Sequence, residues 1–266
     1  MNTTVPDLNY THYSDPAAAG QQPPLLILHG LFGSATNWRS IARQLSTQQP
    51  VFALDLRNHG ASFWDNTMDY PALADDVARF IEQHELGSVH IIGHSMGGKT
   101  AMTLALTRPE LVDRLVVVDI APVTYAHTHA PFIDALLQLD LTALSSRSQA
   151  DQMLREAIPE DGVRLFLLQN LVQQDGTFRW RINLPVLREA MPALIGFPDL
   201  AAHYTGPALF LYGGNSDYVL PDYTVAIERY FPSAQFQVVA GAGHWLHAEQ
   251  PALMVETARQ FFHPGA

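Results

Sequence analysis

A single stretch of the chain satisfies two catalytic patterns at once. Residues 93–100 read GHSMGGKT. The first five letters form G-x-S-x-G, the tight turn that presents a serine, here Ser95, for attack on an acyl carbon. All eight letters also fit G-x-x-x-x-G-K-[ST], in which Lys99 would contact the phosphates of a bound nucleotide. The two patterns predict different hydrolases, so features elsewhere in the chain must decide between them.

The serine pattern makes structural demands that the neighbouring residues meet. The turn needs small residues two positions before and after the serine, because the strand and helix backbones nearly touch there, and Gly93 and Gly97 supply them. The apolar run 89–92 predicts the strand before the turn, and helix-forming residues follow the serine. Ser95 would then begin a helix, where free N–H groups favour negative charge.

One histidine is well placed to act as the base for this serine. His244 ends the glycine-rich segment GAGH, after the last predicted strand and just before the last predicted helix. From such a loop its ring can take the serine proton and return it to the leaving group. We expect His247 in the first turn of the following helix. His127 and His129 are expected at the surface, because no third metal ligand accompanies them.

A second glycine-bounded turn can provide an oxyanion hole. Residues 29–33 read HGLFG and follow the first buried apolar run. The backbone N–H groups of Leu31 and Met96 would then bind the oxygen of a tetrahedral intermediate. Taken alone, the turn would be better explained as an ordinary connection between a strand and a helix.

The segment DLRNHG, residues 55–60, follows another predicted strand. We expect its Asp and Arg to brace a turn beside the site. Contact of Arg57 or His59 with a substrate is the weaker alternative.

Short apolar runs that alternate with helical patterns must position these residues. Each run is bounded by Gly, Pro or Asp and is typical of a strand buried on both faces, as in a parallel sheet. Predicted strands cover residues 25–28, 51–54, 89–92, 115–118, 208–212 and 236–239, and predicted helices cover residues 35–45, 72–82, 95–106, 223–230 and 252–261. This alternation predicts an α/β fold with a doubly wound, mostly parallel sheet that binds ligands at the carboxyl ends of its strands.

The alternation breaks once, between residues 123 and 202. No buried strand is evident there, and apolar residues recur at helical spacing. Residues that follow this spacing are Phe132, Ile133, Leu136, Leu137, Leu165, Leu168, Leu171, Val172, Trp180, Leu184, Leu187, Met191 and Leu194. We therefore predict a core formed by residues 1–122 and 203–266, with residues 123–202 inserted as a helical cap of about four helices.

Composition excludes several classes of function. The chain has 266 residues, 47% of them apolar, a formal net charge of −11 and a single lysine. Without a basic cluster, neither nucleic acid nor an anionic membrane is expected as a partner. The chain has no cysteine, hence no thiolate nucleophile, and no apolar run long enough to span a bilayer. The N-terminal segment does not resemble a signal peptide, so we expect a cytoplasmic protein.

The nucleotide interpretation of residues 93–100 is the weaker one. Its best support is the strand-like run 115–118, which ends at Asp119, a possible ligand for magnesium. However, Lys99 and Asp119 leave room for only one helix and one strand between them, and the loop follows at least two earlier strands. We favour Lys99 as a packed or solvated helix residue.

Several longer strings carry a resemblance to a known family. They are HGLFGS (29–34), DLRNHGAS (55–62), GHSMGGKTAM (93–102), VVVDIAPV (116–123), FRWRINLPVL (178–187), GGNS (213–216) and AGAGHWLHAE (240–249). They span nearly the whole chain, which resembles the α/β-hydrolase superfamily with its chain order of serine, acid and histidine. It is most similar to a group of small bacterial esterases and acyl-thioesterases with a helical cap, and also to a mitochondrial α/β-hydrolase. The lysine belongs to this family's own pattern and adds nothing for nucleotides.

The resemblance leaves two candidates for the acid that would orient His244. Asp217 lies where the superfamily at large carries its acid. The resemblance to the esterase group implies an alternative arrangement, in which the acid lies one strand earlier, at the position of Asp119. In that arrangement a serine that matches Ser216 assists the acid. We favour Asp119 and keep Asp217 as the second choice, and either could instead cap a turn.

We therefore expect an α/β-hydrolase fold and hydrolysis of a small-molecule ester with a short to medium acyl chain, without cofactor or metal. The aromatic residues expected to contact substrate are Phe32, Trp180 and Trp245. The resemblance adds acyl-CoA thioesters, whose phosphates Arg179 and Arg181 of the cap could bind. A carbon–carbon bond hydrolase, a nucleotide hydrolase and an inactive binding module remain as alternatives. Nothing in the sequence indicates an oligomeric state.

Overall fold

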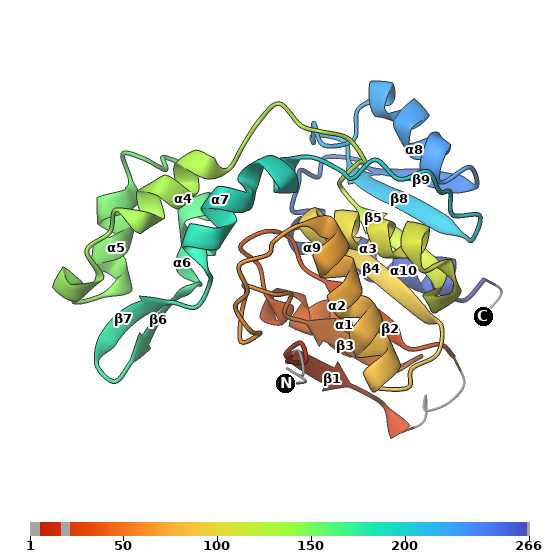
Figure 1. Ribbon diagram of the computed structural model, residues 1–266, viewed down its shortest axis with the longest axis horizontal. Coiled ribbons are helices and arrows are strands. Elements are labelled where there is room, and N and C mark those ends of the chain that lie inside the picture. Colours follow the sequence, from red (N-terminus) through yellow and green to blue (C-terminus); the bar gives the residue numbers. More distant parts are fainter. Residues whose placement is uncertain (1–5, 17–21, 265–266) are drawn as a thin grey trace.

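A mostly parallel β-sheet forms the centre of the molecule (Figure 1). The structure is a computed structural model that describes residues 6–16 and 22–264. The expectation that the N-terminal segment is not a signal peptide concerns residues 1–5, which lie outside the described residues. In the described part, seven strands pair in the order β1-β3-β2-β4-β5-β8-β9. Their bounds are β1 Tyr10–Tyr13, β2 Leu25–Leu28, β3 Val51–Leu54, β4 Val89–His94, β5 Val112–Val118, β8 Ala208–Gly213 and β9 Ala234–Val239. Neighbouring strands are parallel except β1 with β3, as predicted for a doubly wound sheet.

All six predicted strands are present, and the differences lie at the two edges of the sheet. β1 was not predicted, because its sequence YTHY is polar and largely exposed. The prediction that residues 236–239 are buried on both faces is wrong. β9 has a neighbour on one side only, and Phe236 and Val238 expose 37% and 54% of their surface.

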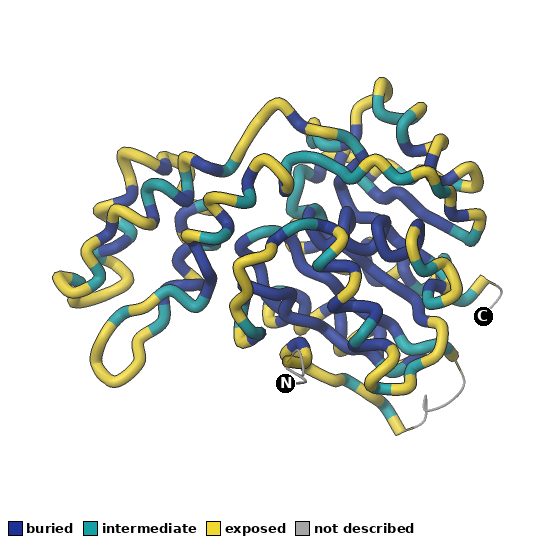
Figure 2. Tube along the Cα trace, viewed as in Figure 1, coloured by how far each residue is buried: buried dark blue, intermediate teal, exposed yellow. Residues whose placement is uncertain are grey.

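Helices cover both faces of the sheet, which is buried between them (Figure 2). On one face α2 packs against α3, and on the other α1 packs against α10. The helices of this core are η2 Ala35–Trp38, α1 Arg39–Leu45, α2 Tyr70–Gln83, α3 Met96–Thr107, η3 Pro109–Leu111, η5 Pro221–Tyr223, α8 Thr224–Tyr230, α9 Leu246–Glu249 and α10 Pro251–Phe262. In the described part of the chain, every helix is too short or too polar to cross a lipid bilayer.

The chain between β5 and β8 builds a separate group of elements, seen at the left of Figure 1. We call residues 123–202 the cap. Its elements are α4 Ala130–Leu137, η4 Leu141–Ala143, α5 Arg147–Leu154, α6 Asp161–Leu168, β6 Leu171–Gln174, β7 Thr177–Trp180 and α7 Leu184–Ile195. The cap contains four α-helices and also the hairpin β6–β7, in a stretch where the apolar spacing predicted helix. Asp175 and Gly176 both have positive φ, 51° and 80°, and such an Asp-Gly pair favours a tight hairpin turn over a helix.

Candidate active site

Ser95 occupies a strained turn between β4 and α3. Its φ of 53° and ψ of −117° are rare for a residue with a side chain, and such strain is held in place only by its surroundings. The surroundings are backbone. A Cβ on Gly93 would lie 2.4 Å from the carbonyl oxygen of Gly97, and one on Gly97 would lie 2.3 Å from that of Leu28. The glycine spacing of the sequence pattern therefore has the predicted cause.

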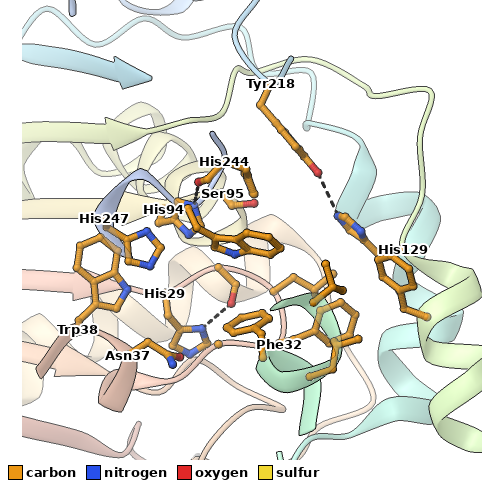
Figure 3. A pocket seen from close by; sticks show the side chains of 18 residues that line it. His29, Phe32, Asn37, Trp38, His94, Ser95, His129, Tyr218, His244 and His247 are labelled. Carbon is orange, nitrogen blue, oxygen red and sulfur yellow. Dashed lines mark hydrogen bonds between the residues drawn. The ribbon is translucent and has the colours of Figure 1, made fainter. Parts of the chain in front are cut away.

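His244 and Asp119 form a hydrogen-bonded pair beside this turn. The Nδ1 atom of His244 lies 2.7 Å from Oδ2 of Asp119, although 125 positions separate the residues in the chain. Because the carboxylate accepts, Nδ1 carries the proton and Nε2 is left with a free lone pair. The loop that carries His244 is fixed by His94, whose Nε2 donates to the His244 carbonyl oxygen at 2.9 Å (Figure 3).

Asp119 is fully buried at the end of β5, with a positive φ of 50°. Two further donors hold its carboxylate. The backbone N–H of Gly213 donates to Oδ1 at 2.9 Å, and the hydroxyl of Ser216 donates to Oδ2 at 2.5 Å. Asp217, the second candidate, is exposed on the turn that follows Ser216. Of the two aspartates, the structure therefore brings Asp119 to the histidine.

Tyr218 joins this group, although no motif of the sequence pointed to it. Its ring stacks on that of His244 with 3.8 Å between centroids, and its hydroxyl lies 3.3 Å from Nε2 of His129 (Figure 3). The surface position expected for His129 is wrong, since the residue is half-buried, and burial lowers its pKa to about 4. His127 is exposed, as expected. His247 lies in α9, also as expected, and stacks on Trp38 at 4.4 Å.

Two neutral histidines shape the turn proposed as the oxyanion hole. Nε2 of His29 accepts the N–H of Leu56 at 3.0 Å, and its Nδ1 donates to the carbonyl oxygen of Gly30 at 2.8 Å. Nε2 of His59 accepts the N–H of Phe32 at 3.3 Å, which supports the positive φ of 64° at that residue. Burial lowers the pKa of His59 to about 3, so the acceptor nitrogen stays unprotonated. The turn is therefore braced by side chains that do not change charge near neutral pH.

The segment after β3 has a structural role. Asp55 accepts the N–H groups of Ala35 and Ala61 at 2.7 and 2.9 Å and so ties two loops together. Arg57 forms a buried, two-point ion pair with Asp76, with distances of 2.5 and 2.8 Å. The predicted bracing is present, although the Arg pairs with an aspartate of α2. Neither Arg57 nor His59 lines a cavity beside Ser95.

Ser95 borders a cavity of about 180 Å³ between the core and the cap. Among its lining residues are His244 and a mostly apolar set contributed by both parts of the chain. That set includes Phe32, Phe132, Val163, Phe166, Leu167 and Trp245. Trp180, expected to contact substrate, is not part of this lining and lies on β7 against the hydrophobic core. Arg179 and Arg181 line a separate groove that does not include Ser95.

Lys99 is used within the protein, which removes the nucleotide interpretation. The residue is 1% exposed, and its Nζ donates to the carbonyl oxygens of Val123, Ile195 and Gly196 at 2.8, 3.0 and 2.5 Å. Its ammonium group also lies 4.7 Å from the ring centre of Tyr125. An ammonium group has three hydrogens. All three are therefore used, and none is left for a phosphate.

No group of three or more His, Asp or Glu residues with the geometry of a metal site occurs in residues 6–16 and 22–264.

Comparison with known proteins agrees with this geometry. Residues 23–251 match the family model described as alpha/beta hydrolase fold. The chain is 46% identical over 256 residues to the sn-1-specific diacylglycerol lipase ABHD11 of Xenopus tropicalis, covering 93% of this chain and 79% of that protein. It is 39% identical over 239 residues to esterase YbfF of Escherichia coli K12, covering 90% and 92%.

A solved structure gives the same result. The protein of solved structure named marine microorganism esterase superposes with a TM-score of 0.91 at 37% identity, covering 96% of this chain and 99% of its own. The expected fold and enzyme class are therefore confirmed. The chain belongs to the α/β-hydrolase family and is an ester-hydrolysing enzyme of the carboxylesterase type.

Proposed function

We propose that this enzyme cleaves carboxylic esters through an acyl-enzyme on Ser95. His244 takes the hydroxyl proton while Oγ attacks the carbonyl carbon, and the N–H groups of Leu31 and Met96 bind the resulting oxyanion. The C–O bond to the alcohol then breaks, and the alcohol leaves with the proton held by His244. A water molecule repeats the sequence on the acyl-enzyme, releases the carboxylic acid and restores Ser95.

The single observation that carries this proposal is the 2.7 Å bond between His244 and Asp119, beside a strained serine. The bond keeps the proton on Nδ1, so that Nε2 is free to accept one from the serine. It also stabilises the imidazolium that forms in the transition state. The hydroxyl of Ser216 and the N–H of Gly213 keep the carboxylate in the orientation that this bond requires.

The substrate we propose is an uncharged ester of a short to medium acyl chain. The cavity of about 180 Å³ beside Ser95 has a mostly apolar lining, which suits a small apolar substrate. The cap supplies one wall of this cavity through α4 and α6. The cap can therefore act as a lid over the site. The names of the relatives also support oxygen esters, since one is a diacylglycerol lipase and two are esterases.

Acyl-CoA thioesters are the second candidate. Ser95 would attack a thioester with the same help from His244 and Asp119. Arg179 and Arg181 line a groove between the hairpin β6–β7 and the core. Two guanidinium groups in one groove can bind phosphate oxygens. This candidate is supported less well than the oxygen ester, because the groove does not include Ser95.

The test is hydrolysis of a series of p-nitrophenyl esters and of acyl-CoA thioesters with the same acyl chains. We expect Ser95→Ala to lower kcat/KM by about a thousandfold or more. Ser40→Ala, which changes an exposed serine of α1, is the matched control and should leave turnover unchanged. Ester turnover that survives in Ser95→Ala would refute the proposal, and a higher kcat/KM for the thioesters would favour the second candidate.

A further inference from the structure

Ser95 lies on the boundary between two cavities. One is the cavity of about 180 Å³ under the cap. The other is a small cavity of about 30 Å³ on the α3 side of the serine, lined mainly by α3, α7 and the chain that follows β5. Leu31 and Ser95 line both, so a substrate carbonyl held at Ser95 has space on either side.

The two cavities differ in their access to the histidine. His244 lines the large cavity and not the small one. In ester cleavage the leaving alcohol takes its proton from the histidine, so the alcohol oxygen must lie within hydrogen-bond reach of that ring. The alcohol therefore extends into the large cavity. The acyl chain points away from the histidine, which places it in the small cavity.

The size of the small cavity sets a limit on the acyl chain. A site of roughly 10–15 Å³ on this measure holds one water molecule. A cavity of about 30 Å³ therefore has room for only two or three carbon atoms beyond the carbonyl. Met191 and Leu194 of α7, which are 2% and 7% exposed, form part of its wall.

Most polar side chains of this small cavity are already engaged, including Tyr218 and His129, which pair with each other at 3.3 Å, while His127 is exposed to solvent. Lys99 uses its three hydrogens on backbone carbonyls. The hydroxyl of Tyr70 donates to the carbonyl oxygen of Leu194, and that of Tyr125 donates to the carbonyl oxygen of Tyr218, both at 2.7 Å. A carboxylate on the acyl chain would find none of these hydrogens free, and burying it unpaired is costly.

We propose that the small cavity is the acyl subsite and the large cavity is the alcohol subsite, so that the enzyme selects short, uncharged acyl groups on larger apolar alcohols. This inference rests on the acyl-enzyme function proposed above. It assigns α7 of the cap to acyl selection and α6 of the cap to alcohol selection.

The experiment measures kcat/KM for 1-naphthyl esters of acyl chains from two to ten carbons. For the wild type we expect butyrate to be preferred over decanoate by at least tenfold, and butyrate over the equally short but charged hemisuccinate by a similar factor. Equal rates for butyrate, decanoate and hemisuccinate would overturn the proposal. Absence of any turnover, or turnover that Ser95→Ala leaves intact, would instead refute the proposed function itself.

Two cap variants separate the subsites. Met191→Ala enlarges only the small cavity and should reduce the preference for butyrate over decanoate by about fivefold or more. Phe166→Ala, the matched control, enlarges only the large cavity. It should leave this ratio within twofold and change the relative rates of methyl, butyl and naphthyl acetate. Leu194→Ala repeats the first test if Met191→Ala does not fold.

The opposite pattern would overturn the assignment. If Phe166→Ala alters the acyl-length ratio while Met191→Ala and Leu194→Ala do not, the acyl chain occupies the large cavity. Ester hydrolysis that depends on Ser95 would remain in that case, so the failure of this inference is distinguishable from a failure of the proposed function.

Discussion

The ammonium nitrogen of Lys99 lies 2.8 Å from the carbonyl oxygen of Val123, where the chain leaves the core for the cap. The same nitrogen bonds the carbonyl oxygens of Ile195 and Gly196, where α7 ends and the chain turns back toward the core. One side chain of α3, four residues after Ser95, therefore holds the start of the cap and the end of its last helix. The lysine that suggested a phosphate site in the sequence instead joins the serine helix to the cap.

Removing this contact should destabilise the protein. Lys99→Met leaves three backbone carbonyls without their donor, and each buried group left unpaired costs about 1–3 kcal/mol, partly offset because no charge is buried any longer. We expect the free energy of unfolding in urea to fall by about 2–4 kcal/mol. Arg43→Met, which removes an exposed cation of α1, is the control and should change stability by less than about 0.5 kcal/mol. An equal loss in both variants would contradict the account.

The same lysine gives stability a defined pH dependence. Burial lowers the pKa of Lys99 from 10.5 to about 7 in the folded protein. Between these values the unfolded chain binds more protons than the folded one, so the cost of burying the charge is greatest below pH 7 and falls as pH rises. From pH 7 to 9, wild type should therefore gain stability relative to Lys99→Met, by at most about 1.4 kcal/mol per pH unit. Urea unfolding of both proteins at several pH values measures this, and a difference that shrinks with rising pH would contradict it.

Substitution of the two aspartates should separate the two candidates for the acid. Asp119→Asn keeps the shape of the side chain but removes the charge that holds the proton on Nδ1 of His244. By the precedent of serine proteases, kcat should fall by about 10³–10⁴. Asp217→Asn changes the exposed carboxylate that directly follows Ser216 in the chain. It is the matched variant and should keep kcat within about twofold. Steady-state kinetics on one ester suffices, and the reverse ranking would assign the acid to Asp217.

Two helical glycines should respond in opposite ways to alanine. In Gly97→Ala the new methyl group would lie 2.3 Å from the carbonyl oxygen of Leu28, so the serine turn must deform and stability should fall by about 3 kcal/mol or more. In Gly162→Ala of α6 nothing lies within 4 Å of the new group, and alanine is the better helix former by up to about 1 kcal/mol. Thermal unfolding measures both. A Gly97→Ala protein as stable and active as wild type would show that the turn does not need the glycine.

The sequence predicted those parts of the structure that depend on local pattern. Buried parallel strands read as apolar runs, and the turn at Ser95 requires glycines whose spacing is visible in the sequence. The hairpin β6–β7 was not predicted because its strands are short and largely exposed, so they lack an apolar run. Its one signal, Asp175-Gly176, was available in the sequence.

Long-range contacts account for the remaining differences. Tyr218 and His129 meet at His244 only because β8, the cap and the last loop converge there, and no spacing in the chain encodes that. The expected substrate contact at Trp180 depended on where the cap rests on the core. The choice between Asp119 and Asp217 likewise rested on family resemblance until the geometry placed one of them against the histidine.

The most direct test of the central claim is to trap the nucleophile. A dialkyl p-nitrophenyl phosphate loses p-nitrophenolate when attacked and leaves a stable dialkylphosphoryl group on the attacking oxygen. We predict one such group per chain, mapped by peptide mass spectrometry to Ser95, with ester hydrolysis lost in proportion to labelling and with no labelling of Ser95→Ala. A label on another residue, or full ester hydrolysis in protein labelled at Ser95, would contradict the account.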